Sequence, residues 1–184
     1  MKKARVSALA NVSGDVFEIG FGTGLNLPHY PAGVKKIVTA DPNPGMAQLA
    51  RRQIAESGIE VDLRILNGES LPIEDNSFDS VVCTWTLCSI PNVGQALREI
   101  RRIMRPEGRF YFVEHGLADD PGVRKWQNRL TPLQRKIGDG CHFNRNIKEL
   151  IADQGFRFEK LDNFYMKKAP RVAGYMYQGI AVKA

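Results

Sequence analysis

Short apolar runs alternate along the 184 residues with segments in which apolar side chains recur at helical spacing. The segments with helical spacing predict helices over 45–57, 92–105 and 148–154. Residues 124–136 could form another helix, which Pro132 would bend or break. Strands alternating with helices indicate an α/β fold with a parallel sheet. The apolar runs predict strands at 15–20, 36–41, 61–66, 78–83, 108–114, 156–164 and 174–183.

Three glycines follow the first predicted strand, at Gly20, Gly22 and Gly24, and lead towards a helix. A backbone without side chains turns sharply and approaches a ligand closely, and a helix N-terminus offers free N–H groups. Leu25 stands where the dinucleotide motif needs its last glycine. Glu18, inside the strand, suits a cationic amino group or orders the loop. The alternative is a tight turn without a ligand.

Asp41 ends the second predicted strand, 17 residues after Gly24. A carboxylate at this position can accept hydrogen bonds from two ribose hydroxyls. It could also act as a turn or N-cap residue ahead of Pro42-Asn43-Pro44, and the two roles can coexist.

The next two strand ends also carry polar or small residues. Asn67 offers an amide for the edge of an adenine, and Gly68 lets a base lie against the backbone. Both lie at a C-terminal strand end, where open α/β sheets bind ligands. Thr84 opens a segment to Ile90 that could line the methionine arm of a cofactor or simply form buried core. Trp85 in that segment is interpreted as packing rather than as a pocket wall.

Taken together, these motifs resemble the class I S-adenosylmethionine (SAM) dependent methyltransferases, nearest to the quinone C-methyltransferases and phospholipid N-methyltransferases. The resemblance implies a Rossmann-like, seven-stranded, mostly parallel sheet with helices on both faces and an antiparallel last strand. It covers about residues 14–115 and rests on Glu18-x-Gly20-x-Gly22-x-Gly24, Asp41, Asn67-Gly68-Glu69-x-Leu71-Pro72, Ser77-Phe78-Asp79 and the stretch from Leu97 to Gly108. The cofactor residues it implies are Glu18, Gly20, Phe21, Gly22, Thr23, Gly24, Asp41, Pro42, Asn67, Gly68, Glu69 and Thr84.

The C-terminal part is similar to methyltransferase-like proteins of lipid-droplet and endoplasmic-reticulum membranes that methylate alkyl thiols. The similar segments are 110–115, Asp139-Gly140-Cys141 with Asn144-Arg145, and 179–183. The family normally has a helical segment ahead of the first strand, and only 13 residues precede Gly14 here. We therefore expect one domain over 1–184 with a shortened N-terminal cap.

Methyl transfer to a thiol, phenol or carbon acid requires loss of a proton, which invites a general base. His115 ends the fifth predicted strand, and histidine is a common general base, so it is the first candidate, with a purely structural role as the alternative. Asp139 flanks Gly140-Cys141 in a segment that could cover the pocket, and it could orient an acceptor or act as base. His142 is a weaker candidate.

Charge and cysteine spacing limit the classes of partner that the protein could bind. Net charge is +6 and the doublets Arg51-Arg52 and Arg101-Arg102 fall in predicted helices, where charge pairs usually form a solvated face. No nucleic-acid motif is present, and contact with an anionic membrane surface stays open as an alternative. Cys83, Cys88 and Cys141 have no metal-ligand spacing, so we expect no metal and free thiols in the cytoplasm.

The sequence therefore predicts a SAM-dependent methyltransferase that acts on a small molecule: a thiol, a quinone-like compound or a lipid. Two rivals remain. One is a SAM-binding scaffold without turnover, which the short N-terminus keeps open. The other is a nicotinamide-dependent oxidoreductase, which Leu25 and Glu18 count against. Oligomeric state is left open.

Overall fold

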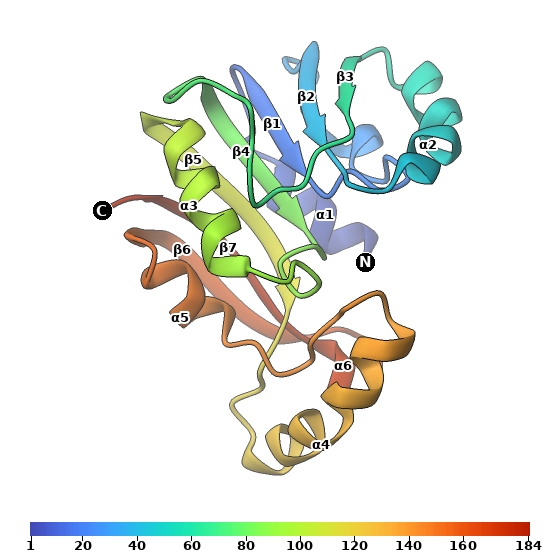
Figure 1. Ribbon diagram of the computed structural model, residues 1–184, viewed down its shortest axis with the longest axis vertical. Helices are drawn as coiled ribbons and strands as arrows, with labels where there is room; N and C mark the ends of the chain where they lie inside the picture. Colours follow the sequence, from blue (N-terminus) through green and yellow to red (C-terminus); the bar gives the residue numbers. More distant parts are fainter.

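A computed structural model describes all residues from 1 to 184 and places the strands in a single twisted sheet (Figure 1). The strand order is β3-β2-β1-β4-β5-β7-β6, and only β7 runs antiparallel to its neighbours. The predicted Rossmann-like architecture with an antiparallel last strand is confirmed. The strands are β1 (Val16–Ile19), β2 (Lys36–Ala40), β3 (Glu60–Arg64), β4 (Phe78–Thr84), β5 (Met104–His115), β6 (Phe156–Tyr165) and β7 (Tyr175–Lys183).

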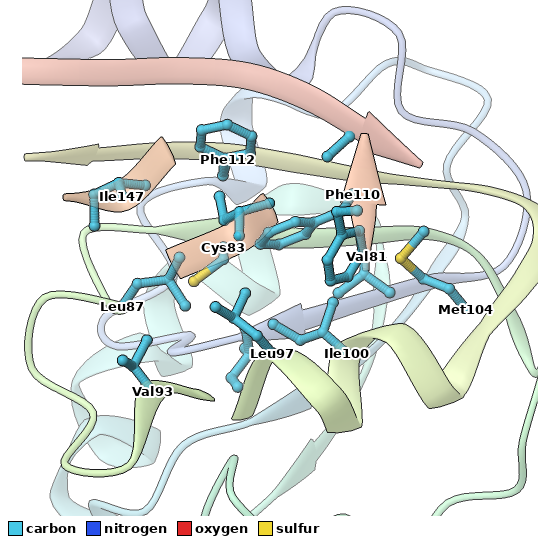
Figure 2. Close-up of a cluster of buried hydrophobic side chains, with 14 of the residues drawn as sticks. Val81, Cys83, Leu87, Val93, Leu97, Ile100, Met104, Phe110, Phe112 and Ile147 are labelled. Carbon is cyan, nitrogen blue, oxygen red and sulfur yellow. The ribbon is translucent and has the colours of Figure 1, made fainter. Parts of the chain in front are cut away.

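Helices cover both faces of the sheet because successive strand residues point to opposite sides. One face packs against α3 and α5, and Figure 2 shows Leu97 and Ile100 of α3 against Val81 and Phe110. The opposite face packs against α1, η1 and α2. Burial of each large aliphatic side chain stabilises this arrangement by about 1.5–3 kcal/mol. The helices are α1 (Lys2–Leu9), η1 (Leu27–His29), α2 (Pro44–Ser57), α3 (Val93–Ile103), α4 (Pro121–Ile137), α5 (Ile147–Ala152) and α6 (Arg171–Gly174).

The sequence suggested that the glycine turn leads into a helix, but no α-helix follows it. Only the single 3-10 turn η1 lies between β1 and β2. Pro28 and Pro31 lack the N–H groups that a longer helix would need, so the crossover stays short. The positive end of a helix macrodipole is therefore missing from this turn, and its ligand contacts must come from loop amides and side chains.

Pro132 neither breaks nor ends α4, which runs from Pro121 to Ile137. The proline leaves one backbone carbonyl of the preceding turn without its usual donor. One residue earlier, the Thr131 hydroxyl donates to the carbonyl of Gln127 at 2.8 Å.

No helix in the structure is long and apolar enough to cross a membrane.

The predicted helix 92–105 ends two residues early, and β5 begins at Met104 rather than at 108. Met104 pairs with Phe78, whereas the next pair joins Arg109 to Ser80. Residues 105–108 therefore form an irregularity that accommodates Pro106 next to a parallel strand.

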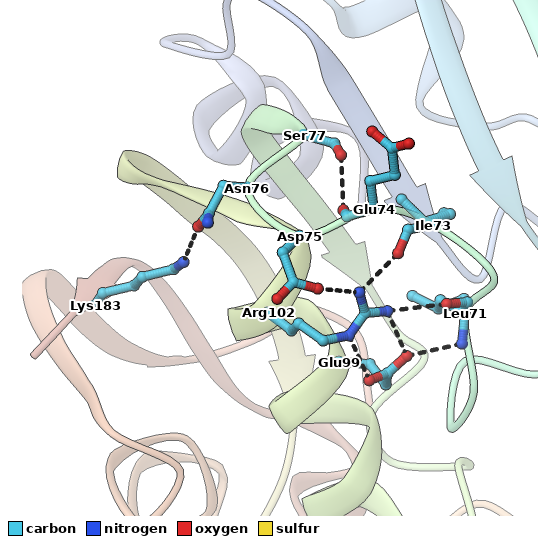
Figure 3. Close-up of polar contacts among 9 residues, drawn as sticks. All are labelled: Leu71, Ile73, Glu74, Asp75, Asn76, Ser77, Glu99, Arg102 and Lys183. Atoms are coloured by element: carbon cyan, nitrogen blue, oxygen red, sulfur yellow. Dashed lines mark hydrogen bonds and ion pairs between the residues drawn. The ribbon is translucent and has the colours of Figure 1, made fainter.

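The doublet Arg101-Arg102 is not a solvated charge pair, and that interpretation of it was wrong. Figure 3 shows the Arg102 guanidinium holding the loop after β3 by donating to Ile73 O at 2.6 Å and Leu71 O at 2.9 Å. Glu99 accepts from Arg102 and from the Leu71 amide, so one helical turn of α3 anchors the loop twice. This loop also carries Asn67 and Gly68, and α3 therefore helps to position them.

Candidate functional site

A cavity of about 630 Å³ opens at the carboxyl ends of β1, β2 and β4. This is the edge where open α/β sheets bind ligands. Nine of the twelve predicted cofactor residues line it: Gly20, Phe21, Gly22, Thr23, Asp41, Pro42, Asn67, Gly68 and Thr84. Of the two predicted catalytic residues, Asp139 lines the cavity and His115 does not.

The glycine turn depends on backbone that other residues adopt with strain. Gly20 and Gly22 have φ values of 74° and 55°, in the left-handed region. A β-carbon at Gly20 would collide with the side chain of Thr86, whereas nothing lies within 4 Å of the corresponding position at Gly22. Gly22 therefore leaves its side of the cavity open for a ligand that approaches the backbone.

Asp41 is fixed by two backbone amides. Its Oδ2 accepts from Gly22 N at 2.8 Å and its Oδ1 accepts from Asn43 N at 2.9 Å. The predicted turn-stabilising role is thus present in the structure. A carboxylate has about four acceptor positions, so two remain for the hydroxyl groups of a ribose.

Glu18 lies behind the cavity wall and does not line it. It is fully buried and accepts from Asn26 Nδ2 at 2.8 Å and from the Tyr30 hydroxyl at 2.6 Å. Burial raises the pKa of Glu18 to about 7, against the effect of these two hydrogen bonds. Its observed contacts match the predicted alternative in which Glu18 orders the loop.

Arg5 lines the cavity and was missed by the sequence analysis. It comes from α1, is buried, and donates through Nη1 to Asn26 Oδ1 at 2.6 Å and to Thr84 Oγ1 at 2.9 Å. It is the single basic residue of the cavity lining. Only the packing of α1 against β5 and β7 brings it there, and no local motif marks it.

Trp85 lines the cavity, so the preference for pure packing at this position was incomplete. Its φ of 53° is rare for a bulky residue and turns the chain at the end of β4. The Arg5 guanidinium lies 4.6 Å from the centroid of its ring. This cation–π contact fixes the guanidinium at the cavity wall.

Of the three predicted cofactor residues in the loop after β3, two line the cavity and one does not. Asn67 and Gly68 line the cavity, and a β-carbon at Gly68 would collide with Ile19. Glu69 instead accepts from Asn92 N, at the start of α3, at 3.0 Å. Gly24, the third predicted residue outside the cavity lining, faces Leu27 and Gln53.

His115 lies beside the cavity wall in a buried group with two cysteines. Its Nε2 is 3.0 Å from Cys141 Sγ, and its Nδ1 is buried without a partner. Cys88 completes the group, and the Sγ and nitrogen atoms of the three residues lie within 4.8 Å of one another. The pKa of Cys141 is lowered to about 4, because Cys88 and then His115 hydrogen-bond to its sulfur. All three cysteines of the chain are free and buried, as expected.

The residues present fit SAM. The cavity has acceptors for ribose hydroxyls at Asp41, an amide at Asn67 for a base, and a cation at Arg5 for a carboxylate. Asp41 and Asn67 follow the neighbouring strands β2 and β3, and Arg5 comes from α1. Their order matches the order of adenine, ribose and methionine in an extended nucleoside cofactor.

Comparisons with known proteins agree with this geometry. The family model described as methyltransferase domain matches residues 17–112. The chain is 35% identical over 166 residues to thiol S-methyltransferase TMT1B of Rattus norvegicus, covering 86% of this chain and 67% of the relative. It is 33% identical over 172 residues to thiol S-methyltransferase TMT1A of Homo sapiens, covering 91% and 70%. The chain thus spans about two thirds of the length of these relatives.

Solved structures show the same fold at low identity. The YcgJ protein from Bacillus subtilis superposes with a TM-score of 0.73 and 17% identity, covering 99% of this chain and 96% of that one. The fold, the matched family model and the identity to curated methyltransferases all point the same way. The chain belongs to the methyltransferase domain family and is a class I SAM-dependent methyltransferase.

Proposed function

We propose that the protein transfers the methyl group of SAM to the sulfur of a small thiol. The observation that supports this acceptor is the similarity to the thiol S-methyltransferases, which covers 86% and 91% of the chain. Those alignments are longer than the family match at 17–112, so they include residues outside that match. Outside it lie Asp139 and Gly140, which line the cavity.

Bound SAM supplies an electrophilic methyl group on a positively charged sulfur. Asp41 would accept hydrogen bonds from the ribose, the Asn67 amide would hydrogen-bond to the base, and Arg5 would pair with the methionine carboxylate. Glu18 acts indirectly. It accepts a hydrogen bond from Asn26, and the Asn26 side-chain oxygen in turn accepts one from Arg5. Such positioning supplies much of the rate of an in-line displacement.

The acceptor enters at the end of the cavity formed by Trp85, Ser89, Ile90, Asp139 and Gly140. Asp139 lines the cavity, which supports a role for it in orienting the acceptor or accepting its proton. His115 lies behind that wall, with its Nε2 3.0 Å from Cys141 Sγ, and does not line the cavity. The apolar and aromatic members of the wall would exclude water from the methyl carbon that is attacked.

The test is turnover with a panel of acceptors. The purified protein and SAM are incubated with an alkyl thiol, the alcohol of the same length, a demethylated quinol and phosphatidylethanolamine vesicles. Mass spectrometry should find the methyl thioether and S-adenosylhomocysteine in equal amounts from the thiol alone. Methylation of the quinol or lipid in preference to the thiol would refute the acceptor. SAM binding without any product would favour a scaffold.

We also propose contact with an anionic membrane surface through α4. Its outer side carries an apolar stripe at helical spacing, Trp126, Leu130, Leu133 and Ile137, of which Ile137 is 74% exposed. Exposed basic residues flank this stripe, namely Lys125, Arg129, Arg135 and Lys136. Apolar stripes with basic flanks are typical of helices that lie in a membrane interface. The helix ends beside Asp139 and Gly140, which would place the acceptor entrance near the lipid.

A further inference from the structure

Three metal-binding side chains converge beside the cavity from distant parts of the chain. Cys88 follows β4, His115 is the last residue of β5, and Cys141 follows α4. One ligand atom from each lies within 4.8 Å of the other two, and all three residues are buried. Because 53 positions separate Cys88 from Cys141, no short sequence motif predicts this cluster.

We propose that Cys88, His115 and Cys141 bind one Zn²⁺, whose fourth coordination position takes the sulfur of the acceptor thiol. Two thiolates and an imidazole are ligands that select zinc. Structural zinc sites are closed by four protein ligands, whereas sites with three keep a position for water or substrate. The described residues offer three ligands at this point, so the geometry is that of an open site.

The ligands are held in place by backbone contacts between their segments. The amide of His142 donates to Cys88 O at 2.9 Å, which joins the two cysteine-bearing segments directly. Glu114 accepts from the amides of Thr86 and Leu87 at 2.8 and 3.1 Å, and so fixes the segment that leads to Cys88. A metal site needs such support, because ligands that are free to move bind weakly.

Both cysteines adjoin the cavity wall in sequence, although none of the three ligands lines the cavity itself. Ser89 follows Cys88, Gly140 precedes Cys141, and both Ser89 and Gly140 line the cavity. Gly140 has a φ of 75°, in the left-handed region, and Asp139 before it a φ of 51°. This sharp turn brings Cys141 behind the wall while its neighbours stay in it.

Charge also favours the site. Two thiolates and a neutral imidazole balance the charge of Zn²⁺, and an acceptor thiolate adds one negative charge. The Arg145 guanidinium donates to the carbonyl of Leu87, the residue before Cys88, and interacts electrostatically with Cys88, Glu114 and Cys141. Its positive charge offsets part of the negative charge gathered there.

This inference rests on the proposed thiol acceptor for its chemical role. The S–H bond of the acceptor breaks on coordination, the proton leaves to solvent, and a zinc–sulfur bond forms. The thiolate then forms the new carbon–sulfur bond as the carbon–sulfur bond to the sulfonium breaks, and the bonding pair leaves with the neutral thioether. No oxidant or reductant is needed.

Metal binding is tested without turnover. The reduced, chelator-treated protein is titrated with Co²⁺, which replaces zinc and gives thiolate charge-transfer bands and tetrahedral d–d bands. We expect one Co²⁺ per chain, displaced by one Zn²⁺, with the bands lost in Cys88→Ser and Cys141→Ser. The control Cys83→Ala removes the third buried thiol, which contacts Glu114, and should keep the bands. Absence of the bands in the wild-type protein, or their survival in Cys88→Ser/Cys141→Ser, overturns the site.

The role of the fourth position has its own readout. An alkyl thiol added to the Co²⁺ protein should shift the d–d bands, and the alcohol of the same length should not. Unchanged bands would overturn coordination of the acceptor. Because these spectra are recorded without SAM, they are independent of the turnover panel. Methylation of thiols by a metal-free protein at an undiminished rate would likewise refute the zinc role while sustaining the proposed function.

Discussion

Arg5 Nη1 lies 2.9 Å from Thr84 Oγ1, although 79 positions separate the two residues. The bond joins α1, at the start of the chain, to the last residue of β4 in the middle of the sheet. It places a guanidinium at the cavity wall, where the proposed function needs a partner for a carboxylate. A short N-terminal helix thereby completes a site that otherwise comes from strand ends.

Replacing Arg5 by alanine should weaken SAM binding by about 10- to 100-fold. A hydrogen bond to a charged group contributes about 1.5–3 kcal/mol, and no other basic side chain lines the cavity. Calorimetric titration with SAM measures the change. Lys3→Ala, on an exposed position of the same helix, should leave affinity unchanged. Equal affinity of Arg5→Ala and the wild-type protein would remove Arg5 from the binding site.

Asp41→Asn should lower the affinity for SAM about tenfold while the turn remains folded. An asparagine keeps one acceptor for a backbone amide but loses the charge and half of the acceptor positions. The matched control is Asp62→Asn, which changes a part-exposed carboxylate of β3 that pairs with Arg64 of the same strand. Titration of both variants with SAM and with NAD separates ribose binding from general destabilisation. A stronger response to NAD than to SAM would contradict the assigned cofactor.

Stability should fall as pH rises from about 4.5 to 7 because of Glu18. Its pKa is about 7 in the folded protein against 4.5 without burial, so in this window the native state holds a proton that the unfolded chain has lost. The unfolded state binds fewer protons, and the free energy of unfolding therefore declines by up to about 3 kcal/mol from this group.

Glu18→Gln removes that titration and can keep hydrogen bonds to Asn26 and Tyr30. We expect the melting temperature of the variant, relative to the wild-type protein, to rise between pH 5 and 7 and to level off above. Thermal melts across this range, without cofactor, measure the difference. A constant offset at every pH would show that Glu18 does not titrate in this window.

Arg102→Ala should destabilise the protein by roughly 2 kcal/mol and weaken SAM binding through Asn67 and Gly68. The guanidinium donates to two carbonyls of the loop that carries these residues, and the carbonyls lose their partner in the variant. Urea unfolding and SAM titration check the two effects. Arg52→Ala breaks an exposed ion pair with Glu56 on α2 and should change neither.

Leu133→Glu/Ile137→Glu should abolish sedimentation with vesicles that contain anionic lipid. The two substitutions place charge in the apolar stripe of α4 and leave the buried side of the helix unchanged. Leu49→Glu, at an exposed position of α2, is the matched control and should bind like the wild-type protein. Binding should also weaken with added salt. Equal loss of binding in the control would argue against a dedicated face.

The elements that repeat a local pattern could be predicted from the sequence. The helix over 45–57 starts at an Asn43 cap and ends at Gly58 in the left-handed conformation, so its bounds follow from local chemistry. The strand periodicity and the glycine turn likewise depend on neighbours in sequence. Nine of the twelve residues predicted to bind a cofactor line the cavity, because the carboxyl ends of parallel strands meet at one edge.

Other features depend on contacts between distant segments. Arg102 looked like a surface charge because its partners, Leu71 and Ile73, lie about thirty positions earlier in a loop without a pattern. Glu69 resembled a cofactor residue, yet it contacts the start of α3. Pro132 was expected to bend or break a helix that persists around it.

The sequence by itself determined the fold class, the strand-end positions of the cofactor residues and the family. These follow from periodicity and short motifs, which are properties of neighbouring residues. Only the tertiary structure decided that Arg5 enters the cavity and that Cys88, His115 and Cys141 share one point in space. The physical reason is that packing of α1 on the sheet, and of the segment after α4 on the loop after β4, brings together residues whose separations in sequence carry no period.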